Sequence, residues 1–418
     1  MPAEKKPGCY RLLHTADWHL GKLLNDQSRD AEHAMFLDWL LAAVAEHRVD
    51  AIVLSGDVFD SANPPQSALA GYYNFVSRLF RQGNCAFIAI AGNHDSPAQL
   101  EAPKNALHAL NAHVAGCLAE NPSDRILCLP DSSNPQVAVA MVPFLRDRDL
   151  RVGKEGDGSA EIQAQLVSGI QSRYAETAAA AKHLKCPVIA TGHLTVAGAA
   201  ASDSEREIHI GGLGAVGAGI FPPEFAYTAL GHLHRPQNCG ADGRVRYSGS
   251  PIALGFGEAG DAKEVRILDA SPDGIAHFGL AVPTFRKLVQ IRATRAGLGP
   301  ALESINAEPG TLRPWVEVVV EDAGLEMDPA SAVRALCEGK NFDVLKVLRG
   351  RQASHSGMSA GEASDDEAID NLLGDAAAVF GHLLAEQPDL GAADADALRI
   401  AFRSLLESAQ QNGPGGAA

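Results

Sequence analysis

The chain has 418 residues, which predicts two or three domains and ample material for a hydrophobic core. Hydrophobic residues make up 46% and charged residues 21%, the proportions of an ordinary soluble globular protein. The formal net charge of −16 argues against a protein that binds nucleic acid through a basic surface alone, because that binding needs Lys and Arg. Residues 352–418 contain 11 acidic and 2 basic residues, which leaves a mild charge of −7 for the rest.

The sequence contains no membrane or disulfide signature. The first nine residues, MPAEKKPGC, are polar, and no apolar run approaches the length of a membrane span. The cysteines number 7, are scattered, and form no CxxC pair. We therefore expect a cytoplasmic protein without a membrane partner, a disulfide framework or a zinc–cysteine site.

Short apolar runs alternate with helical patterns from residue 10 to about residue 280. This alternation predicts an α/β fold in which helices pack on a sheet. Strands are predicted at 10–16, 51–55, 85–91, 137–142, 187–191 and 227–230, and helices at 28–47, 67–82, 97–110 and 159–184. Residues 244–280 are expected to add an antiparallel β portion.

The remainder of the chain changes in character near Pro283. Residues 286–350 show the order strand, helix, strand, helix, strand, and two amphipathic helices are predicted at 366–386 and 393–409. We divide the chain into a main domain over 1–285, a small α+β domain over 286–350, a flexible linker over 351–365, a helical tail over 366–410 and a disordered end over 411–418.

Polar side chains follow five successive apolar runs, and four of these turns carry a glycine. The residues are Asp17 and His19, then Asp57, then Asn93, His94 and Asp95, then His193, and finally His232 and His234. In an extended chain, residues two apart point to the same side, so the two histidines of GHLH face one spot. Each position alone is also typical of a turn or a helix cap, but five together predict convergence at one sheet edge.

This set of side chains favours a dinuclear metal site. Two carboxylates crowded without a cation would repel each other and lose hydration, and a bound metal removes that cost. Carboxylate, imidazole and carboxamide ligands suit Mn, Fe or Zn rather than Ca. Asp57, alone at its strand end, is the candidate for a carboxylate shared by two ions. Such a pair lowers the pKa of a bound water from about 15.7 to about 7 and binds both oxygens of an in-line phosphoryl displacement.

The GNHDS segment supplies the expected acid. We interpret Asn93 as a metal ligand and His94 as a residue outside the ligand set that donates a proton to the leaving oxygen. Asp95 is expected to hold the His94 ring in the productive tautomer.

The motifs DWHLG, GDVFD, GNHDS, GH and GHLH, in this order, resemble the signatures of the calcineurin-like metallophosphoesterases. The longer stretches VDAIVLSGDVFD and FPPEFAYTALGHLHRPQ resemble the SbcD subunits of bacterial SbcCD nucleases, a family related to DNA double-strand-break repair nucleases. The resemblance covers about residues 10–285 in sequence and 286–410 only in layout. It implies a four-layer α/β sandwich, a capping domain at 286–350 and a C-terminal helical tail.

The resemblance also implies which residues hold each ion. The first metal would be bound by Asp17, His19, Asp57 and His234, and the second by Asp57, Asn93, His193 and His232. His94 would act on the leaving group. The implied metal is Mn²⁺, with Mg²⁺ as the alternative.

The implied activity is a 3′–5′ exonuclease on double-stranded DNA and an endonuclease on single strands and hairpins, in DNA repair, recombination and replication. The family forms dimers, and the helices within 366–410 would dock on the coiled coil of an SbcC-like ATPase. The chain lacks a Walker A motif, so any ATP dependence must come from that partner.

Two rival functions remain. A small-substrate phosphodiesterase or phosphatase would use the same metal chemistry, but it needs neither the capping domain nor the tail. A scaffold that has lost catalysis would show no metal-dependent turnover of any phosphoester, although all the expected site residues are present.

Overall fold

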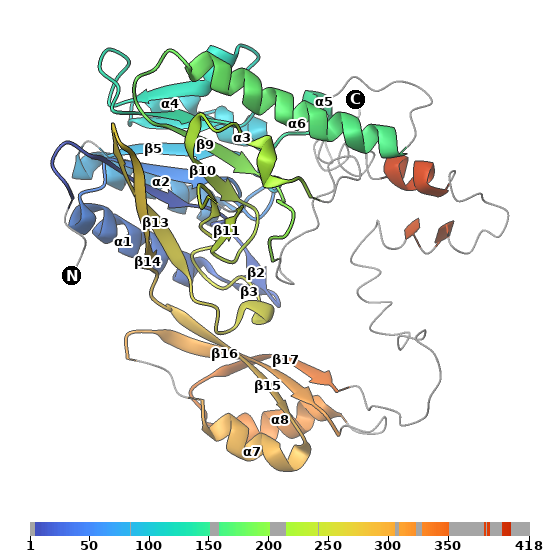
Figure 1. Cartoon of the computed structure of the whole chain (residues 1–418). Helices are drawn as coiled ribbons and strands as arrows, with labels where there is room; N and C mark the ends of the chain where they lie inside the picture. The colour runs from blue at the N-terminus through green and yellow to red at the C-terminus, as the bar shows by residue number, and fades with distance from the viewer. Residues whose placement is uncertain are drawn as a thin grey trace, which may run out of the picture.

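The structure is a computed structural model that describes residues 5–83, 85–150, 159–200, 215–240, 242–305, 309–322, 328–350, 380–381, 383–384 and 395–402. Two six-stranded sheets and a smaller three-stranded module make up most of it (Figure 1). Among these residues, no helix is long and apolar enough to cross a lipid bilayer.

The first sheet is mainly parallel, and its central strands are buried over their whole length. Such strands read as continuous apolar runs because both faces are covered. In spatial order the strands are β14 (Gly274–Ala281), β13 (Glu264–Ser271), β1 (Tyr10–Thr15), β4 (Ala51–Ser55), β5 (Ala86–Ile90) and β6 (Ala112–Ala115). The antiparallel β13–β14 pair fulfils the prediction for 244–280.

The second sheet also has parallel central strands, but an antiparallel strand flanks them at each edge, whereas the first sheet is antiparallel on its β13–β14 side alone. Its strands, in spatial order, are β11 (Gln237–Cys239), β12 (Val245–Tyr247), β10 (Phe225–Gly231), β9 (Val188–His193), β8 (Val137–Ala140) and β7 (Ile126–Leu129). A short hairpin of β2 (Leu23–Leu24) and β3 (Gln27–Ser28) follows β1.

Helices cover the outer face of each sheet, so the main domain has four layers (Figure 1). On the first sheet lie α1 (Asp30–His47) and α2 (Gln66–Gln82), whose Phe36, Leu40 and Phe75 pack on the strands. On the second lies α6 (Ser159–Ala181), where Leu166, Ile170 and Tyr174 are buried; α5 (Asp147–Leu150) precedes it. The predicted four-layer α/β sandwich is confirmed.

A third core lies between the two sheets and joins them. Leu12, Val53 and Ile189 belong to it. His14, also on β1, is fully buried. Its Nδ1 lies 3.1 Å from the hydroxyl of Tyr227 and its Nε2 lies 3.2 Å from the carbonyl oxygen of Leu230, and both of these residues are on β10. A buried imidazole bonded on both nitrogens therefore links the sheets.

The module after the main domain has the predicted order of elements. It comprises β15 (Arg286–Ala293), α7 (Arg295–Glu303), β16 (Leu312–Val320), α8 (Pro329–Cys337) and β17 (Asp343–Arg349), with the strands parallel and β16 in the centre. Leu298, Leu302 and Val333 of the helices pack against valines of β16.

One contact of this module with the main domain is centred on the aromatic ring of Trp315. The Arg286 guanidinium lies 4.0 Å from the centroid of the Trp315 ring, and Arg29 of the main domain lies 5.7 Å from it. Glu32, on α1, pairs with both arginines, at 2.6 Å and 3.2 Å. Buried charges of both signs and an aromatic face thus fix this contact.

Some elements differ from the prediction. The helix expected at 97–110 is two short helices, α3 (Pro97–Glu101) and α4 (Lys104–His108), because Pro103 has no N–H with which to continue α3. The short strands β6 and β7 and the 3₁₀ turns η1 (Pro122–Arg125), η2 (Ala218–Ile220) and η3 (Phe256–Glu258) were not anticipated.

The linker predicted at 351–365 and the disordered end at 411–418 lie outside the described residues. Most of the helical tail does too. The described tail residues are helical, and the rings of Phe380 and Phe402 stack with centroids 4.0 Å apart. The two tail segments therefore pack against each other.

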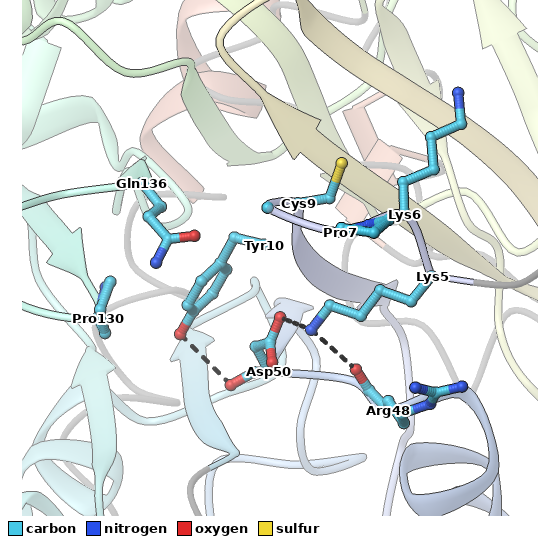
Figure 2. A pocket seen from close by; sticks show the side chains of 10 residues that line it. Lys5, Lys6, Pro7, Cys9, Tyr10, Arg48, Asp50, Pro130 and Gln136 are labelled. Carbon is cyan, nitrogen blue, oxygen red and sulfur yellow. Dashed lines mark hydrogen bonds and ion pairs between the residues drawn. The ribbon is translucent and has the colours of Figure 1, made fainter.

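A hollow of about 940 Å³ opens at the amino ends of β1 and β4 (Figure 2). Lys5, Lys6 and Arg48 line it, and Lys5 pairs with Asp50. Ligands of open α/β sheets bind at the carboxyl ends of the strands, so this hollow lies at the wrong edge for the predicted chemistry.

We expect acid to destabilise the fold through His14. Burial lowers the pKa of His14 from 6.5 to about 3, so below pH 6.5 the unfolded chain binds a proton that the folded chain does not. The free energy of unfolding should therefore fall as the pH decreases from about 6.5 to 3, by up to about 1.4 kcal/mol per pH unit for this residue. Urea unfolding in EDTA at pH 7.5, 6.5 and 5.5 measures it. The variant His14→Gln should show a weaker pH dependence, and an unchanged slope would contradict the assignment.

Candidate metal centre

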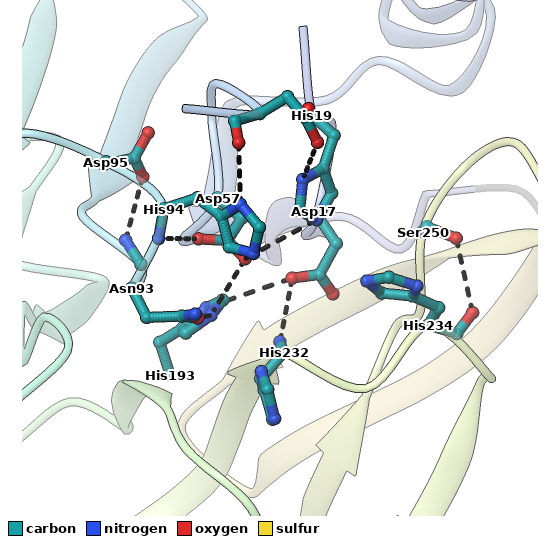
Figure 3. A network of polar contacts seen from close by, with 12 residues as sticks. Asp17, His19, Asp57, Asn93, His94, Asp95, His193, His232, His234 and Ser250 are labelled. Atoms are coloured by element: carbon teal, nitrogen blue, oxygen red, sulfur yellow. Dashed lines mark hydrogen bonds and ion pairs between the residues drawn. The ribbon is translucent and has the colours of Figure 1, made fainter. Parts of the chain in front are cut away.

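Five strand ends from both sheets converge on one buried site (Figure 3). β1, β4 and β5 of the first sheet lead into Asp17, Asp57 and Asn93, while β9 ends at His193 and β10 leads into His232. The strands of each set are parallel, which brings their carboxyl ends to one edge. The site predicted from the sequence therefore exists as a single cluster.

The backbone at this edge is held in an unusual conformation. Asp17, His19, Asp57 and His232 have φ angles of 54°, 46°, 48° and 101°. Residues other than glycine pay about 1–3 kcal/mol each for such angles, and strained positions of this kind gather at functional sites. Hydrogen bonds from Asp17 N to Gly56 O (3.1 Å) and from His19 N to Asp57 O (3.0 Å) join the two loops.

Asp57 is the centre of the cluster. Its Oδ2 lies 3.3 Å from Nε2 of His193, 3.5 Å from Nε2 of His19 and 4.0 Å from Nε2 of His94. Two groups of potential ligand atoms result, His19–Asp57–His94 and Asp17–Asp57–His193. Both include Asp57, which is the geometry required of a carboxylate shared by two ions.

The other expected ligands adjoin these groups. Asn93 Oδ1 lies 2.9 Å from His193 Nε2, and the His232 backbone N–H donates to Asp17 Oδ1 (2.8 Å). The ring centroid of His232 lies 5.5 Å from that of His193, and the ring of His234 lies 5.2 Å from that of His19. The structure thus brings together all seven residues expected to bind metal.

The donor set fits a pair of cations. Asp17 Oδ2 and His19 Nε2 are buried and have no hydrogen-bond partner among the described residues. Leaving such atoms unsatisfied is costly unless an ion occupies the space between them. The residues present therefore suit divalent metals, with carboxylate and imidazole donors around a shared Asp57.

Electrostatics differ between the ligands. At His193, burial is outweighed by the nearby Asp57, which raises the pKa to about 9, whereas two other ligand histidines shift the opposite way. Burial raises the pKa of Asp17 to about 7, whereas His193, His94 and His19 together outweigh burial at Asp57 and hold its pKa well below the usual value. Burial lowers the pKa of His19 to about 4 and that of His232 well below its usual value. Both imidazoles are therefore neutral at physiological pH, the form that binds metal.

Asp95 differs from its expected role. Its carboxylate accepts backbone N–H groups from Gly92 (2.9 Å), Val58 (3.1 Å) and Phe59 (3.0 Å), and so joins the loops after β4 and β5. The partner of His94 Nδ1 is instead the Asp60 carbonyl oxygen, at 2.7 Å. The prediction that Asp95 orients the His94 ring is therefore wrong, because the Asp95 carboxylate is bound to backbone N–H groups of the two loops instead.

Three supporting groups were not anticipated. The Ser55 carbonyl lies 2.9 Å from Nδ1 of His193, and the carboxylates of Asp60 and Glu258 contact His19 and His234. Asp60 stands within the GDVFD motif, so its position was a usable signal. Glu258 lies 24 residues after His234, and nothing in the local sequence indicates it.

The chain was compared with known proteins. The family described as calcineurin-like phosphoesterase matches residues 10–236, and the type 5 capsule protein repressor C-terminal domain matches residues 284–387. The SbcD subunit of the SbcCD nuclease of Escherichia coli K12 is 37% identical over 87% of this chain and 92% of its own length. Its counterpart in Rhodobacter capsulatus is 40% identical over 71% of this chain and 75% of its own length.

Fold, site and matching residues define a calcineurin-like metallophosphoesterase, that is, a metal-dependent phosphodiester hydrolase. Within that class, the chain belongs to the SbcD family.

Substitution of Gly92 tests whether metal binding depends on the position of Asp57. A Cβ at this position would overlap Oδ1 and the backbone nitrogen of Asp57. We expect Gly92→Ala to displace Asp57, to reduce the number of divalent metal ions bound and to lower the free energy of unfolding by about 1–3 kcal/mol. Metal analysis after dialysis and urea unfolding measure the two effects.

Gly71→Ala is the matched control, because a Cβ there meets no atom within 4 Å and the residue lies within α2. It should bind metal normally and be slightly more stable. Full metal content in Gly92→Ala would show that the position of Asp57 is not needed.

Proposed function

We propose that this protein is the nuclease subunit of an SbcCD-like complex and hydrolyses DNA phosphodiester bonds with two Mn²⁺ ions. The proposed activities are 3′–5′ exonuclease on double strands and endonuclease on single strands and hairpins. The observation that carries the proposal is Asp57, shared by two groups of ligand atoms where five strands end. Mg²⁺ is the alternative metal.

The proposed ligands follow the family pattern. Asp17, His19, Asp57 and His234 would hold one ion, and Asp57, Asn93, His193 and His232 the other. Among the described residues, the potential ligand atoms that lie closest together are those of Asp17, Asp57 and His193, and those of His19, Asp57 and His94. Distances alone therefore do not give the two ligand sets of the family pattern. When bound, the ions would lower the pKa of a water and neutralise charge on the phosphoryl oxygens.

His94 is the proposed acid. Its Nδ1 contacts the Asp60 carbonyl, so this nitrogen carries a proton, and Nε2 is the atom that can hand a proton to the leaving oxygen. In this step the His94 ring begins protonated on both nitrogens: as water attacks phosphorus and releases a proton to solvent, the bond to the leaving oxygen breaks, that oxygen takes the Nε2 proton, and His94 is then reprotonated from solvent. The ring is 7% exposed, which keeps bulk water from competing for the transfer.

The proposed partners are DNA, a second copy of this chain and an SbcC-like ATPase. The relatives are named as subunits of a nuclease complex and match most of this chain, which supports such an assembly. We propose the helical tail, where Phe380 and Phe402 stack, as the docking segment. The net charge of −16 means that DNA retention would depend on metal ions and the partner.

Cleavage of end-labelled DNA tests the proposal. The purified chain is incubated with Mn²⁺ and duplex, hairpin or single-stranded DNA, with and without an SbcC-like ATPase, and with bis(p-nitrophenyl) phosphate alongside. DNA cleavage that EDTA abolishes supports a nuclease. Turnover of the small diester, with no DNA cut in the presence of the ATPase, would favour the small-substrate enzyme. No turnover of either would favour a scaffold.

We expect His94→Ala to reduce hydrolysis by about 10²- to 10⁴-fold, because the leaving oxygen loses its proton donor. The content of Mn²⁺ should remain that of the wild type, since His94 is not a proposed ligand. Rate assays and metal analysis on the same preparation measure both quantities. His183→Ala is the control, because His183 is exposed beyond α6. Loss of metal together with activity would instead make His94 a ligand.

A further inference from the structure

Four histidines of the metal centre, His19, His94, His193 and His234, share one arrangement: Nδ1 faces an oxygen atom of the protein. For His193 and His94 this oxygen is a backbone carbonyl, of Ser55 at 2.9 Å and of Asp60 at 2.7 Å. For His19 and His234 it is a carboxylate, of Asp60 at 3.1 Å and of Glu258 at 2.9 Å. In the rings of His19, His193 and His234, Nε2 is then the nitrogen that can bind a metal, and in His94 it is the nitrogen that faces the reaction.

Each of these two carboxylates, of Asp60 and Glu258, also forms an ion pair with a lysine. Lys22 Nζ lies 3.1 Å from Asp60 Oδ1. Lys263 contacts Glu258 and donates to the His234 carbonyl and the Ser250 hydroxyl, both at 3.0 Å. Glu258 is fully buried and Lys263 nearly so, at 8% exposure. Burying a glutamate and a lysine is costly, so their retention beside a ligand histidine suggests a role.

We propose that Glu258 with Lys263, and Asp60 with Lys22, are positioning residues that orient His234 and His19 and tighten one of the two metal ions. The proposal rests on the function given above, in which both histidines bind the same ion. A carboxylate that accepts the Nδ1 proton fixes the tautomer and the ring angle and makes Nε2 a stronger donor. The lysine pairs with the same carboxylate and so holds it in place against the ring.

The two metal positions are therefore unequal. His193, assigned to the other ion, is held by a neutral carbonyl oxygen, which strengthens Nε2 less than a carboxylate does. The ion at His19 and His234 should be the one bound more tightly.

Mn²⁺ titration followed by electron paramagnetic resonance tests this on the full-length protein, with the wild type, Glu258→Gln and Asp60→Asn. The wild type should bind two ions. Each variant should weaken one of the two by about 10- to 100-fold and leave the other unchanged. Glu264→Gln is the matched control: it removes an ion pair with Arg266 at 2.8 Å, near in sequence but outside the site.

Thermal unfolding in EDTA separates positioning from folding. A purely structural Glu258 would lower the melting temperature of the metal-free variant but leave both Mn²⁺ affinities intact. Wild-type affinities in both variants overturn the inference. If Glu258→Gln does not fold, Asp60→Asn decides, because the Asp60 side chain is 24% exposed and its backbone carbonyl is kept. A wild type that binds no Mn²⁺ would instead refute the proposed function.

Discussion

The structure depends on placing two carboxylates, Asp17 and Asp57, in one dry space among histidines. Without cations the burial of Asp17 opposes folding, because it raises the pKa of that carboxyl to about 7, whereas the histidines around Asp57 stabilise its charged form. Strained φ angles at both residues add to the cost. The layers of helices around the sheets supply the apolar burial that offsets these terms. The apolar packing around the sheets therefore stabilises a fold that contains two buried carboxylates.

The sheets must meet closely for this site to form, and small residues permit it. A Cβ on Gly231 would overlap the Ser55 carbonyl, which is the oxygen that orients His193. The Ser55 hydroxyl donates to Ala229 O at 3.0 Å, so the contact between sheets is polar as well as close. Below it, the buried His14 bridges β1 and β10. Hydrogen bonds thus join the two sheets, and one of them, between the Ser55 carbonyl and His193 Nδ1, also orients a proposed ligand.

Much of this could be predicted from the sequence because parallel strands bring their carboxyl ends together. Polar residues after buried runs, such as Asp57 and His193, therefore indicated a common site. Predictions from neighbouring residues were wrong or missing where a contact between distant segments determines the geometry. Asp95 accepts backbone N–H groups and does not orient the His94 ring as predicted. Glu258, in a turn beyond β12, contacts His234 and was not predicted. Pro103 was a readable signal for the break between α3 and α4. Contacts between distant segments carry no periodic pattern, so the sequence cannot display them.

The turn η3 belongs to two parts of the protein at once. Phe256, at its start, packs with Leu288 and Trp315 of the α+β module (residues 286–350). Glu258, at its end, contacts Nδ1 of His234. Only Gly257 therefore lies between the residue that contacts the module and the residue that contacts the metal centre. Rotation of the module about this contact would move Phe256 and, through the same turn, the carboxylate that orients a ligand. A displacement of residues 286–350 would thereby change the setting of a proposed metal ligand without touching that ligand.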